Sequence, residues 1–309
     1  SEMSIPILRS VDAVREFRNK IVAEFYEKNH RFPTIGFVPT MGALHQGHIS
    51  LIKKARENND FVMASVFVNP KQFAPHEDFA AYPRTLEADC KLLAPAGCDA
   101  VFAPTDEVMY PAVPKYLTYV TIEGSDSVSE GAARPGFFRG VATVVTKLFN
   151  IVQPTNAYFG QKDGLQAIMV QQFVRDLNIP VHITVCPIVR AEDGLALSSR
   201  NAYLSAEERA AAPALYKSLC AAKAAFDNGE REIANLRKAV TDKLAEEPRF
   251  KIDYLSVANA VTAEELAGTA TPELLKDGLF ISIAAWIGTT RLIDNIVIQI
   301  GRASCRERV

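Results

Sequence analysis

Thr34-Ile35-Gly36-Phe37-Val38-Pro39-Thr40-Met41-Gly42-Ala43-Leu44-His45-Gln46-Gly47-His48 is the stretch that decides the fold. Residues 34–38 form a short apolar run that is typical of a buried parallel strand. Residues 49–56, which follow the stretch, place Ile49, Ile52 and Ala55 on one helical face. The stretch is therefore predicted to be a strand, a glycine-bearing turn and the start of a helix.

This predicted turn has the character of a phosphate site. A strand–turn–helix unit directs backbone N–H groups and the positive end of a helix dipole towards the turn. His45 and His48 lie three residues apart and can face one point, and Gly42 and Gly47 remove Cβ atoms where a ligand must approach. Two imidazoles can stabilise charge during phosphoryl or nucleotidyl transfer. Two alternatives stay open: a zinc site, for which no Cys or carboxylate cluster adjoins the pair, and two structural histidines.

The string from Pro39 to His48 resembles the signature of the pantoate–β-alanine ligase (pantothenate synthetase) family, within the HxGH nucleotidylyltransferase superfamily. The HxGH core alone is also shared with class I aminoacyl-tRNA synthetases, whereas the longer string is more specific. The resemblance covers roughly residues 5–300. It implies catalytic roles for His45 and His48, and it implies ATP contacts for Met41, Gly42, Ala43, Leu44, His45, Gln46, Gly47 and His48.

Asn69-Pro70-Lys71-Gln72-Phe73 follows the second predicted strand, residues 60–68. Pro70 cannot continue a strand, and Gln72 carries both donors and an acceptor that suit a hydroxy acid or an amide-forming substrate. A surface loop glutamine is the alternative. The resemblance implies that Gln72 contacts both pantoate and β-alanine.

Gly160-Gln161-Lys162-Asp163 stands at the carboxyl end of a strand predicted for residues 156–159. A lysine at this place delivers a point charge to a phosphate, although a solvated turn lysine is the alternative. Gln166 falls on the same side of the next predicted helix as Asp163. The resemblance implies ATP contacts for Gly160, Gln161, Lys162 and Asp163, and a pantoate contact for Gln166.

Gly194-Leu195-Ala196-Leu197-Ser198-Ser199-Arg200-Asn201 combines small hydroxyl side chains with an arginine. Hydroxyl groups can donate to phosphate oxygens, and the guanidinium of Arg200 offers a planar fork for them. Such a string is common in loops, so by itself it is a weak signal. The resemblance implies ATP contacts at Val189, Leu197, Ser198, Ser199 and Arg200, with Lys162 and Arg200 in catalytic roles.

Three further residues carry weaker signals. Asp89, on a helix predicted for residues 86–94, could help to hold a magnesium–phosphate group, but a solvated helix carboxylate is the favoured interpretation. Arg134 could hold an anion or fold over its own loop. Phe137 stands where the resembled family commonly has a histidine, and we assign it no role.

Alternating strands and helices predict an α/β fold, a Rossmann-like doubly wound parallel sheet, in residues 1–189. A further strand is predicted for residues 116–122. A capping box at Ser205 opens an Ala-rich helix, and residues 190–300 are predicted to form a second, smaller α+β lid domain. We interpret residues 301–309 as a frayed tail that need not be native, and Ser1-Glu2 as an addition ahead of Met3.

The composition restricts the class of protein. The chain has 309 residues and a net charge of −2, which disfavours a nucleic-acid partner. Its five cysteines form no C-x-x-C pair, which favours reduced thiols and a cytoplasmic location. It has no apolar run of about 18 residues, so no membrane span is expected.

The resemblance implies a ligase that condenses pantoate with β-alanine and splits ATP to AMP and pyrophosphate through a pantoyl adenylate. It also implies Mg²⁺ held mainly through the phosphates, and a homodimer. We expect the Ser198–Arg200 loop and the second domain to close over the adenylate, because water would hydrolyse it. Two alternatives are a nucleotidylyltransferase that stops at an adenylated product and a non-catalytic nucleotide-binding regulator. Gln72 and Gln166, both uncharged, disfavour a phosphorylated substrate, and the intact set of His45, His48, Lys162 and Arg200 disfavours a regulator.

Overall fold

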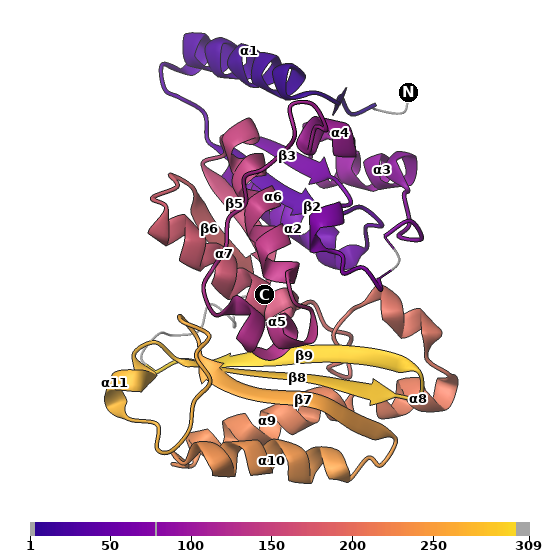
Figure 1. The fold of residues 1–309 in the computed structure, drawn as a ribbon, viewed down its shortest axis with the longest axis vertical. Helices are drawn as coiled ribbons and strands as arrows, with labels where there is room; N and C mark the ends of the chain where they lie inside the picture. The colour runs from indigo at the N-terminus through magenta and orange to yellow at the C-terminus, as the bar shows by residue number, and fades with distance from the viewer. Residues whose placement is uncertain (1–3, 78, 301–309) are drawn as a thin grey trace. The chain divides into compact units, whose positions relative to one another are not determined.

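The computed structural model describes residues 4–77 and 79–300, and the predicted tail at 301–309 lies outside them. The chain divides into two compact units. The first unit holds the residues up to Ser127, Gly131–Gly160 and Met169–Cys186. The second unit holds Val128–Glu130, Gln161–Ile168 and the residues from Pro187 onward. Each unit has its own sheet (Figure 1).

The first unit is built on a six-stranded parallel sheet in the order β1-β4-β3-β2-β5-β6, which confirms the predicted α/β, doubly wound fold. The elements that enter it are β1 (Ile7–Leu8), α1 (Val11–Asn29), β2 (Ile35–Thr40), α2 (Gln46–Asn58), β3 (Phe61–Val66), η1 (Pro70–Gln72), α3 (Leu86–Ala96), β4 (Ala100–Phe102), α4 (Asp106–Met109), η2 (Ser125–Ser127), α5 (Ser129–Ala133), α6 (Phe137–Val152), β5 (Asn156–Gly160), η3 (Gln161–Asp163), α7 (Gly164–Asp176) and β6 (His182–Cys186). Of these, η3 and parts of α5 and α7 group with the second unit.

Alternation along the strands produces one core on each face of the sheet. Phe37 on β2 and Phe102 on β4 join a cluster with apolar residues of α1, α6 and α7. Their neighbours Val38 and Val101 point the other way and join a second cluster with α2 and α3. Successive strand residues face opposite sides, so a continuously apolar strand is what two covered faces require.

The order of the strands fixes where a ligand can bind in the first unit. Strand β2 lies between β3 and β5, and the chain runs outward from it in both directions. In open parallel sheets, ligands bind beyond the carboxyl ends of the strands at such a reversal point. The turn after β2 carries the two histidines, and the Gly160–Asp163 motif begins at the last residue of β5.

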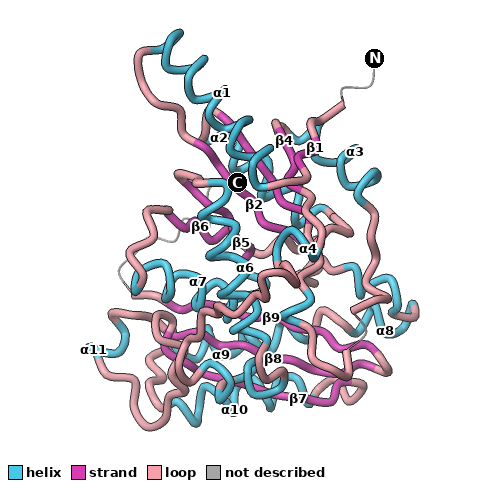
Figure 2. Tube along the Cα trace, turned by 45° about the horizontal axis from the view of Figure 1, so that its top comes forward, coloured by secondary structure: helices cyan, strands magenta, loops and turns pink. Residues whose placement is uncertain are grey.

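The strand predicted for residues 116–122 is wrong. The described chain is extended there but pairs with no sheet (Figure 2). The amide of Val120 donates to the hydroxyl of Thr143 on α6, and Tyr116 packs edge to face against Tyr110 and Tyr119. These contacts hold the segment against α6 by side chains and one amide, rather than by a ladder.

The second unit is a three-stranded antiparallel sheet in the order β7-β8-β9, with α9 and α10 packed along one face (Figure 1). The capping box predicted at Ser205 is confirmed, since its side chain accepts from the Glu208 amide and its amide donates to the Glu208 carboxylate. The elements of this unit are η4 (Ser199–Tyr203), α8 (Ala206–Ala211), α9 (Ala214–Asp227), α10 (Ile233–Ala245), β7 (Phe250–Asn259), α11 (Pro272–Leu275), β8 (Leu279–Ile287) and β9 (Thr290–Ile298).

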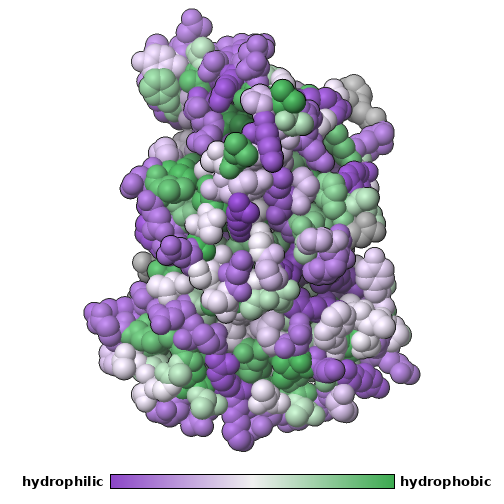
Figure 3. Space-filling model, in the orientation of Figure 1, coloured by the Kyte–Doolittle hydropathy of each residue, from purple (hydrophilic) through white to green (hydrophobic). Residues whose placement is uncertain are grey.

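The surface is mixed in character. On the face in Figure 3, hydrophobic groups are interspersed among hydrophilic ones. None of the described helices has both the length and the apolar character that a membrane crossing needs.

Candidate active site

The turn after β2 is held in its shape by contacts inside the protein. Gly42 and Ala43 have φ of 81° and 51°, two successive left-handed residues. A Cβ at Gly42 would lie 2.9 Å from Asp89 Oδ2, and one at Gly47 would lie 2.7 Å from Cε1 of His45. From the sequence, these glycines were expected to make room for a ligand. In the structure they make room for two side chains of the protein, those of Asp89 and His45. Both positions must be glycine for the turn and the His45 ring to pack.

Asp89 anchors this turn. Its side chain is only 2% exposed, so the solvated carboxylate favoured from the sequence is wrong. Oδ2 accepts from the Ala43 amide at 3.2 Å and from the Thr85 hydroxyl at 3.1 Å. Oδ1 accepts from the Leu44 amide at 3.0 Å. Backbone N–H groups are strong donors that must be paired when buried, and a carboxylate from α3 pairs two of them.

The two histidines cap their own helix. His45 is the N-cap of α2, and its Nδ1 accepts from the Gly47 amide at 3.0 Å. The His45 amide donates to Nδ1 of His48 at 3.2 Å, and the ring centroids lie 4.2 Å apart. A neutral imidazole has one N–H and one acceptor nitrogen. Because each Nδ1 is an acceptor here, each neutral ring carries its proton on Nε2.

This arrangement decides which groups of the turn can meet a ligand. The amides of Gly42, Ala43, Leu44, His45 and Gly47 all donate within the protein. The expectation that the turn aims its backbone N–H groups at a phosphate therefore does not hold for these five. The two Nε2–H groups are the donors that the turn fixes in place, and they suit phosphate oxygens. Among the described residues, no group of three or more His, Cys, Asp or Glu is placed to hold a metal ion, so the zinc alternative lacks a third ligand.

Gln72 occupies the carboxyl end of β3, in the short helix η1. It is 8% exposed, and its Oε1 accepts from Asn69 Nδ2 at 2.8 Å. Asn69 in turn donates to the Gly140 carbonyl and accepts from the Tyr110 hydroxyl. Since the Gln72 carbonyl is engaged in this network, its amide NH₂ is the group suited to donate to a substrate oxygen.

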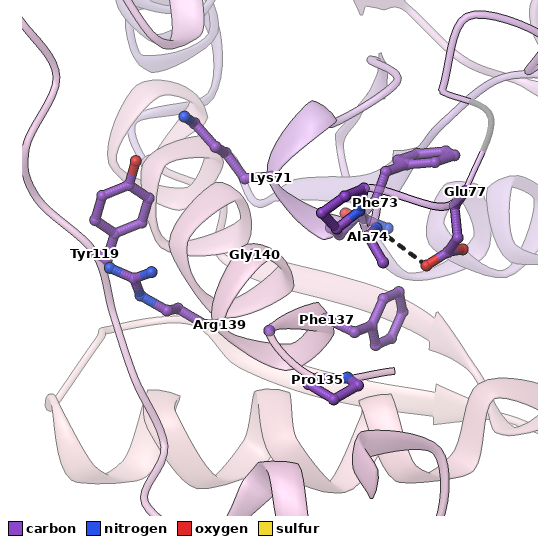
Figure 4. Close-up of a pocket in the computed structure, with 12 residues that line it drawn as sticks. Lys71, Phe73, Ala74, Glu77, Tyr119, Pro135, Phe137, Arg139 and Gly140 are labelled. Carbon is purple, nitrogen blue, oxygen red and sulfur yellow. Dashed lines mark hydrogen bonds between the residues drawn. The ribbon is translucent and has the colours of Figure 1, made fainter. Parts of the chain in front are cut away.

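A pocket of about 300 Å³ adjoins Gln72 within the first unit (Figure 4). Lys71, Arg139 and Tyr119 lie on one side of it, and Phe137, Pro135 and Glu77 lie on the other. The Arg139 guanidinium stacks over the Tyr119 ring at 3.9 Å. The pocket combines two cations with apolar walls, which suits a small acid with a hydrocarbon part.

Arg134 folds over its own loop, the second of the two interpretations made from the sequence. Its guanidinium pairs with Glu77 at 2.7 Å and stacks over the Phe137 ring at 4.0 Å. The phenyl ring at the position where the resembled family commonly has histidine therefore has a packing contact in the first unit. The Arg134 charge is already matched by a carboxylate.

In the second unit, the segments around Lys162, Val189 and Leu197 come together. Lys162 Nζ donates to the Leu197 carbonyl at 3.2 Å, and the Leu197 amide donates to the Val189 carbonyl at 2.9 Å. Burial lowers the pKa of the Lys162 ammonium below its ordinary value. Asp163 opposes this shift and Arg200 adds to it. Three of the predicted ATP-binding segments are thus joined directly by hydrogen bonds.

The Ser198–Arg200 segment begins the short helix η4. The Ser198 Oγ is its N-cap and accepts from the Arg200 amide at 3.2 Å, so its O–H can still donate. Arg200 is exposed, and its guanidinium donates to the Arg291 carbonyl at 3.4 Å. Gln166 is half-buried on α7 and also groups with the second unit, whereas His45, His48 and Gln72 belong to the first.

Two buried polar residues of β9 support this part of the second unit. Asp294 pairs with Arg190 through two contacts of 2.7 and 2.8 Å, and Asn295 bonds to Gln161 and Lys162. The sequence reasoning assigned no role to either residue. The available signal was a polar pair between two apolar pairs of the strand, Leu292-Ile293 and Ile296-Val297.

Comparison with known proteins agrees with this geometry. The family profile described as "Pantoate-beta-alanine ligase" matches residues 7–297. A pantothenate synthetase of Chloroflexus aurantiacus is 52% identical over 278 residues, which cover 90% of this chain and 96% of that protein. The crystal structure of pantothenate synthetase from Thermus thermophilus superposes with a TM-score of 0.81 at 43% identity, covering 96% of this chain and 100% of that one.

A further solved relative carries ligands. It is the pantoate–β-alanine ligase of Francisella tularensis in complex with "Beta-gamma ATP" and β-alanine, with a TM-score of 0.70 and 33% identity. The match covers 95% of this chain and 98% of that one. With a family profile that spans nearly all of its length and relatives that are half identical over nine tenths of it, this chain belongs to the pantoate–β-alanine ligase family.

Proposed function

We propose that the paired imidazoles of His45 and His48 stabilise the phosphorus centre in the first of two steps that this enzyme performs. As a pantoate–β-alanine ligase, the chain joins pantoate to β-alanine with ATP as co-substrate. A pantoate carboxylate oxygen bonds to the α-phosphorus, and the bond to the β-phosphate breaks to release pyrophosphate. The β-alanine amine then attacks the acyl carbon, AMP leaves, and the nitrogen loses a proton.

The observation that carries the proposal is the self-capping of the two histidines. Because backbone amides hold both Nδ1 atoms, two Nε2–H donors stand at one helix start without reorganisation. Donors fixed before the reaction stabilise charge as it develops on the phosphate oxygens. We assign the Nε2–H of His48 as the leading hydrogen-bond donor of the pair.

We further propose that cationic and hydroxyl groups of the second unit bind the ATP phosphates. Lys162 and Arg200 supply charge, and Ser198 and Ser199 supply O–H donors. The remaining nucleotide contacts of this proposal follow the family motifs: Met41, Gly42, Ala43, Leu44, Gln46, Gly47, Gly160, Gln161, Asp163, Val189 and Leu197. Gln72 and Gln166 bind the hydroxy acid, and the pocket beside Gln72 supports this assignment.

Mg²⁺ is part of the proposal as an ion bound to the nucleotide. The Asp89 carboxylate already accepts from two amides and a hydroxyl, and the described residues hold no three-ligand cluster. The ion would therefore be held through phosphate oxygens and water, as is usual for Mg²⁺. There it would neutralise charge on the phosphates that Lys162, Ser198, Ser199 and Arg200 bind.

We propose that the chain forms a homodimer by pairing residues 116–122 of two copies in an antiparallel ribbon. The segment is extended, and among the described residues no backbone acceptor bonds to the amides of Leu117, Thr118 and Thr121. Leu117 is 74% exposed. An unpaired extended segment is a template for another strand. In sedimentation experiments we expect a dimer that Thr118→Pro weakens, whereas a monomeric wild type would refute the proposal.

Two further proposals concern the organisation and location of the chain. We propose that residues 1–189 and 190–300 are its domains, so that limited proteolysis should cut near residue 190. We propose a cytoplasmic location, which the free thiols of Cys90, Cys98, Cys186 and Cys220 support, because reducing compartments keep such thiols unpaired. Neither a nucleic acid nor a membrane is among the proposed partners.

Mass spectrometry tests the proposed reaction. The protein is incubated with ATP, Mg²⁺ and pantoate, with and without β-alanine. We expect a pantoate-dependent adenylate without the amine, and AMP with pantothenate when the amine is present. A product that keeps its adenylate in the presence of β-alanine would instead identify a nucleotidylyltransferase.

A further inference from the structure

Asn295 is a buried amide in the middle of β9. It is 3% exposed, and its side chain reaches the turn that carries Lys162. Its Nδ2 donates to the Gln161 carbonyl at 2.8 Å and to the Lys162 carbonyl at 3.2 Å. Its Oδ1 accepts from Gln161 Nε2 at 2.9 Å. One side chain therefore makes three hydrogen bonds to two successive residues.

The turn needs an external support. Residues Gln161–Asp163 form a single 3-10 turn between β5 and α7, and the hydrogen bonds of such turns have poorer geometry than those of an α-helix. Space around the contact is closed, because a Cβ at Gly164 would lie 2.8 Å from Asn295 Nδ2. The side-chain amide of Asn295 and the turn are therefore in close contact, and a shift in one must move the other.

Asn295 is itself held in place. The backbone N–H of Asn295 donates to Oδ1 of Asp294 at 2.8 Å, and the Asp294 carboxylate forms two hydrogen bonds with Arg190. The Arg190 guanidinium also stacks over the Tyr216 ring at 3.7 Å. Strand β9, the chain around Val189 and the Lys162 turn thus form one continuous network in the second unit.

We infer that Asn295 is a positioning residue for Lys162, which fixes the turn that presents the ammonium to the phosphates of ATP. This inference rests on the proposed role of Lys162. Asn295 bonds to the backbone on which the Lys162 side chain stands, and the Nζ of that side chain bonds to Leu197. Groups that act on phosphates must be held to within a fraction of an ångström, and misplacement by about 1 Å can cost about 100-fold in rate.

The test compares Asn295→Ala with Asn259→Ala. Asn259 is a matched control, because it is also buried, at 8% exposure, and bonds to Asp277, Val261 and Thr262 instead of the Lys162 turn. Affinity for α,β-methylene-ATP with Mg²⁺ is measured by calorimetry, and Tm is measured for each variant. We expect N295A to bind at least about tenfold more weakly and N259A within about twofold of wild type, at similar losses of Tm.

A double-mutant cycle with Lys162→Ala separates positioning from general damage. If Asn295 acts through Lys162, N295A/K162A should bind no more weakly than K162A, within about twofold. Independent, additive losses would overturn the inference. Unchanged affinity in K162A would instead overturn the proposed role of Lys162, so the two failures are distinguishable.

Two further variants complete the design. Asn295→Leu keeps the branched shape of the side chain but cannot donate to the two carbonyls, so we expect it to bind as weakly as N295A. Wild-type affinity in N295L would show a packing role and overturn the inference. Asn295→Ser leaves a smaller gap and provides the same comparison if N295A does not fold.

Discussion

The turn after β2 and the turn after β5 are held by opposite chemistry. Asp89 supports the first by accepting from the backbone amides of Ala43 and Leu44. Asn295 supports the second by donating to the backbone carbonyls of Gln161 and Lys162. In both cases a buried polar side chain from another element pairs the backbone, so the side chains of the turn are the groups that can act on a ligand.

The two turns also differ in the charge they offer. The first presents two imidazoles whose Nε2–H donors are neutral in the tautomer fixed by the capping contacts. The second presents an ammonium, and Arg200 lies close enough to lower its pKa. Neutral donors suit charge that develops during the reaction, whereas cations suit charge already present on ATP. The following predictions separate these roles.

His48→Ala is expected to have the largest effect, because it removes an Nε2–H donor and the acceptor for the His45 amide. We expect turnover to fall by about 10²–10³-fold, the usual loss for one donor at a charged transition state, towards the upper end. The side-chain oxygen of His48→Asn can accept from the His45 amide, but this variant has no donor at the position of Nε2. Its turnover should therefore remain low. The exposed His182 serves as the control. Near-normal pyrophosphate release by H48A would refute its role.

Lys162→Ala is expected to lose about 10²–10³-fold in turnover with the fold intact, since it removes the cation that we propose to bind a phosphate. Lys223→Ala is the matched control, because Lys223 pairs with Asp227 one helical turn away at the surface. Steady-state rates and circular dichroism for both variants provide the comparison. Equal rates for K162A and K223A would assign Lys162 to the solvated-turn alternative.

Asp89→Asn is expected to reduce turnover by about 10–100-fold, because an amide oxygen replaces only one of the two acceptor oxygens and the turn loosens. Asp99→Asn is the control in the same unit, since Asp99 accepts from the Val62 amide and Arg56 and does not contact the turn. The two variants should lose similar stability, but only D89N should lose activity.

The magnesium interpretation of Asp89 predicts something different for the same variant. If Asp89 held the ion, raising the Mg²⁺ concentration should restore much of the rate of D89N. If Asp89 holds the turn, saturating Mg²⁺ should leave the loss unchanged. A magnesium titration of D89N therefore decides between an anchor and a metal ligand.

The pH dependence of turnover tests the charge of the second turn. A required ammonium is lost as pH rises through its pKa, and burial has lowered the pKa of Lys162 below its ordinary 10.5. The basic limb should therefore begin at a lower pH than for an exposed lysine. In Lys162→Arg the limb should move upward, because a guanidinium stays charged. An unchanged limb in K162R would assign it to another group.

The sequence predicted the motifs well and their supports poorly. Apolar runs that stop before Pro39, Asn69 and Gly160 locate the ends of β2, β3 and β5 to within a few residues, because a strand buried on both faces has a local signature. Asp89 was misread because its partners lie 45 and 46 residues away. Asn295 was missed for the same reason, since Gln161 is 134 residues away.

Two other differences have a physical cause. The aromatic and β-branched residues of 116–122 are typical of a strand, but a strand also needs a partner, and local sequence does not specify one. The mutual capping of His45 and His48 was not predicted because Ser, Thr, Asp and Asn are the usual caps. In each case the local pattern was interpreted correctly, but the contact that decides the structure was not predicted.

Asp60 provides the smallest expected effect on turnover and completes the comparison. It stands at the amino ends of β2 and β3, where its carboxylate accepts from the Thr34 amide and pairs with Arg31. Asp89 also accepts from backbone amides through its carboxylate, but Asp60 does so at the end of the strands away from the histidines. We expect Asp60→Asn to leave turnover unchanged and to reduce the free energy of unfolding.

The hydrogen bond from Arg31 lowers the pKa of Asp60 from 3.8 to about 2, against the effect of burial. A lowered pKa means that the stabilisation is present above the unfolded value and is lost as pH falls towards about 2. Because the Arg31 side chain is 57% exposed, we expect only about 1–2 kcal/mol at pH 7. In urea unfolding, D60N should be less stable than wild type at pH 7, and this difference in the free energy of unfolding should be smaller near pH 2. Asp227→Asn, which removes an exposed pair, should change the free energy of unfolding little. If D60N also loses turnover, then a carboxylate at either end of these strands affects the site. The effect of D89N would then not be specific to the turn that Asp89 contacts.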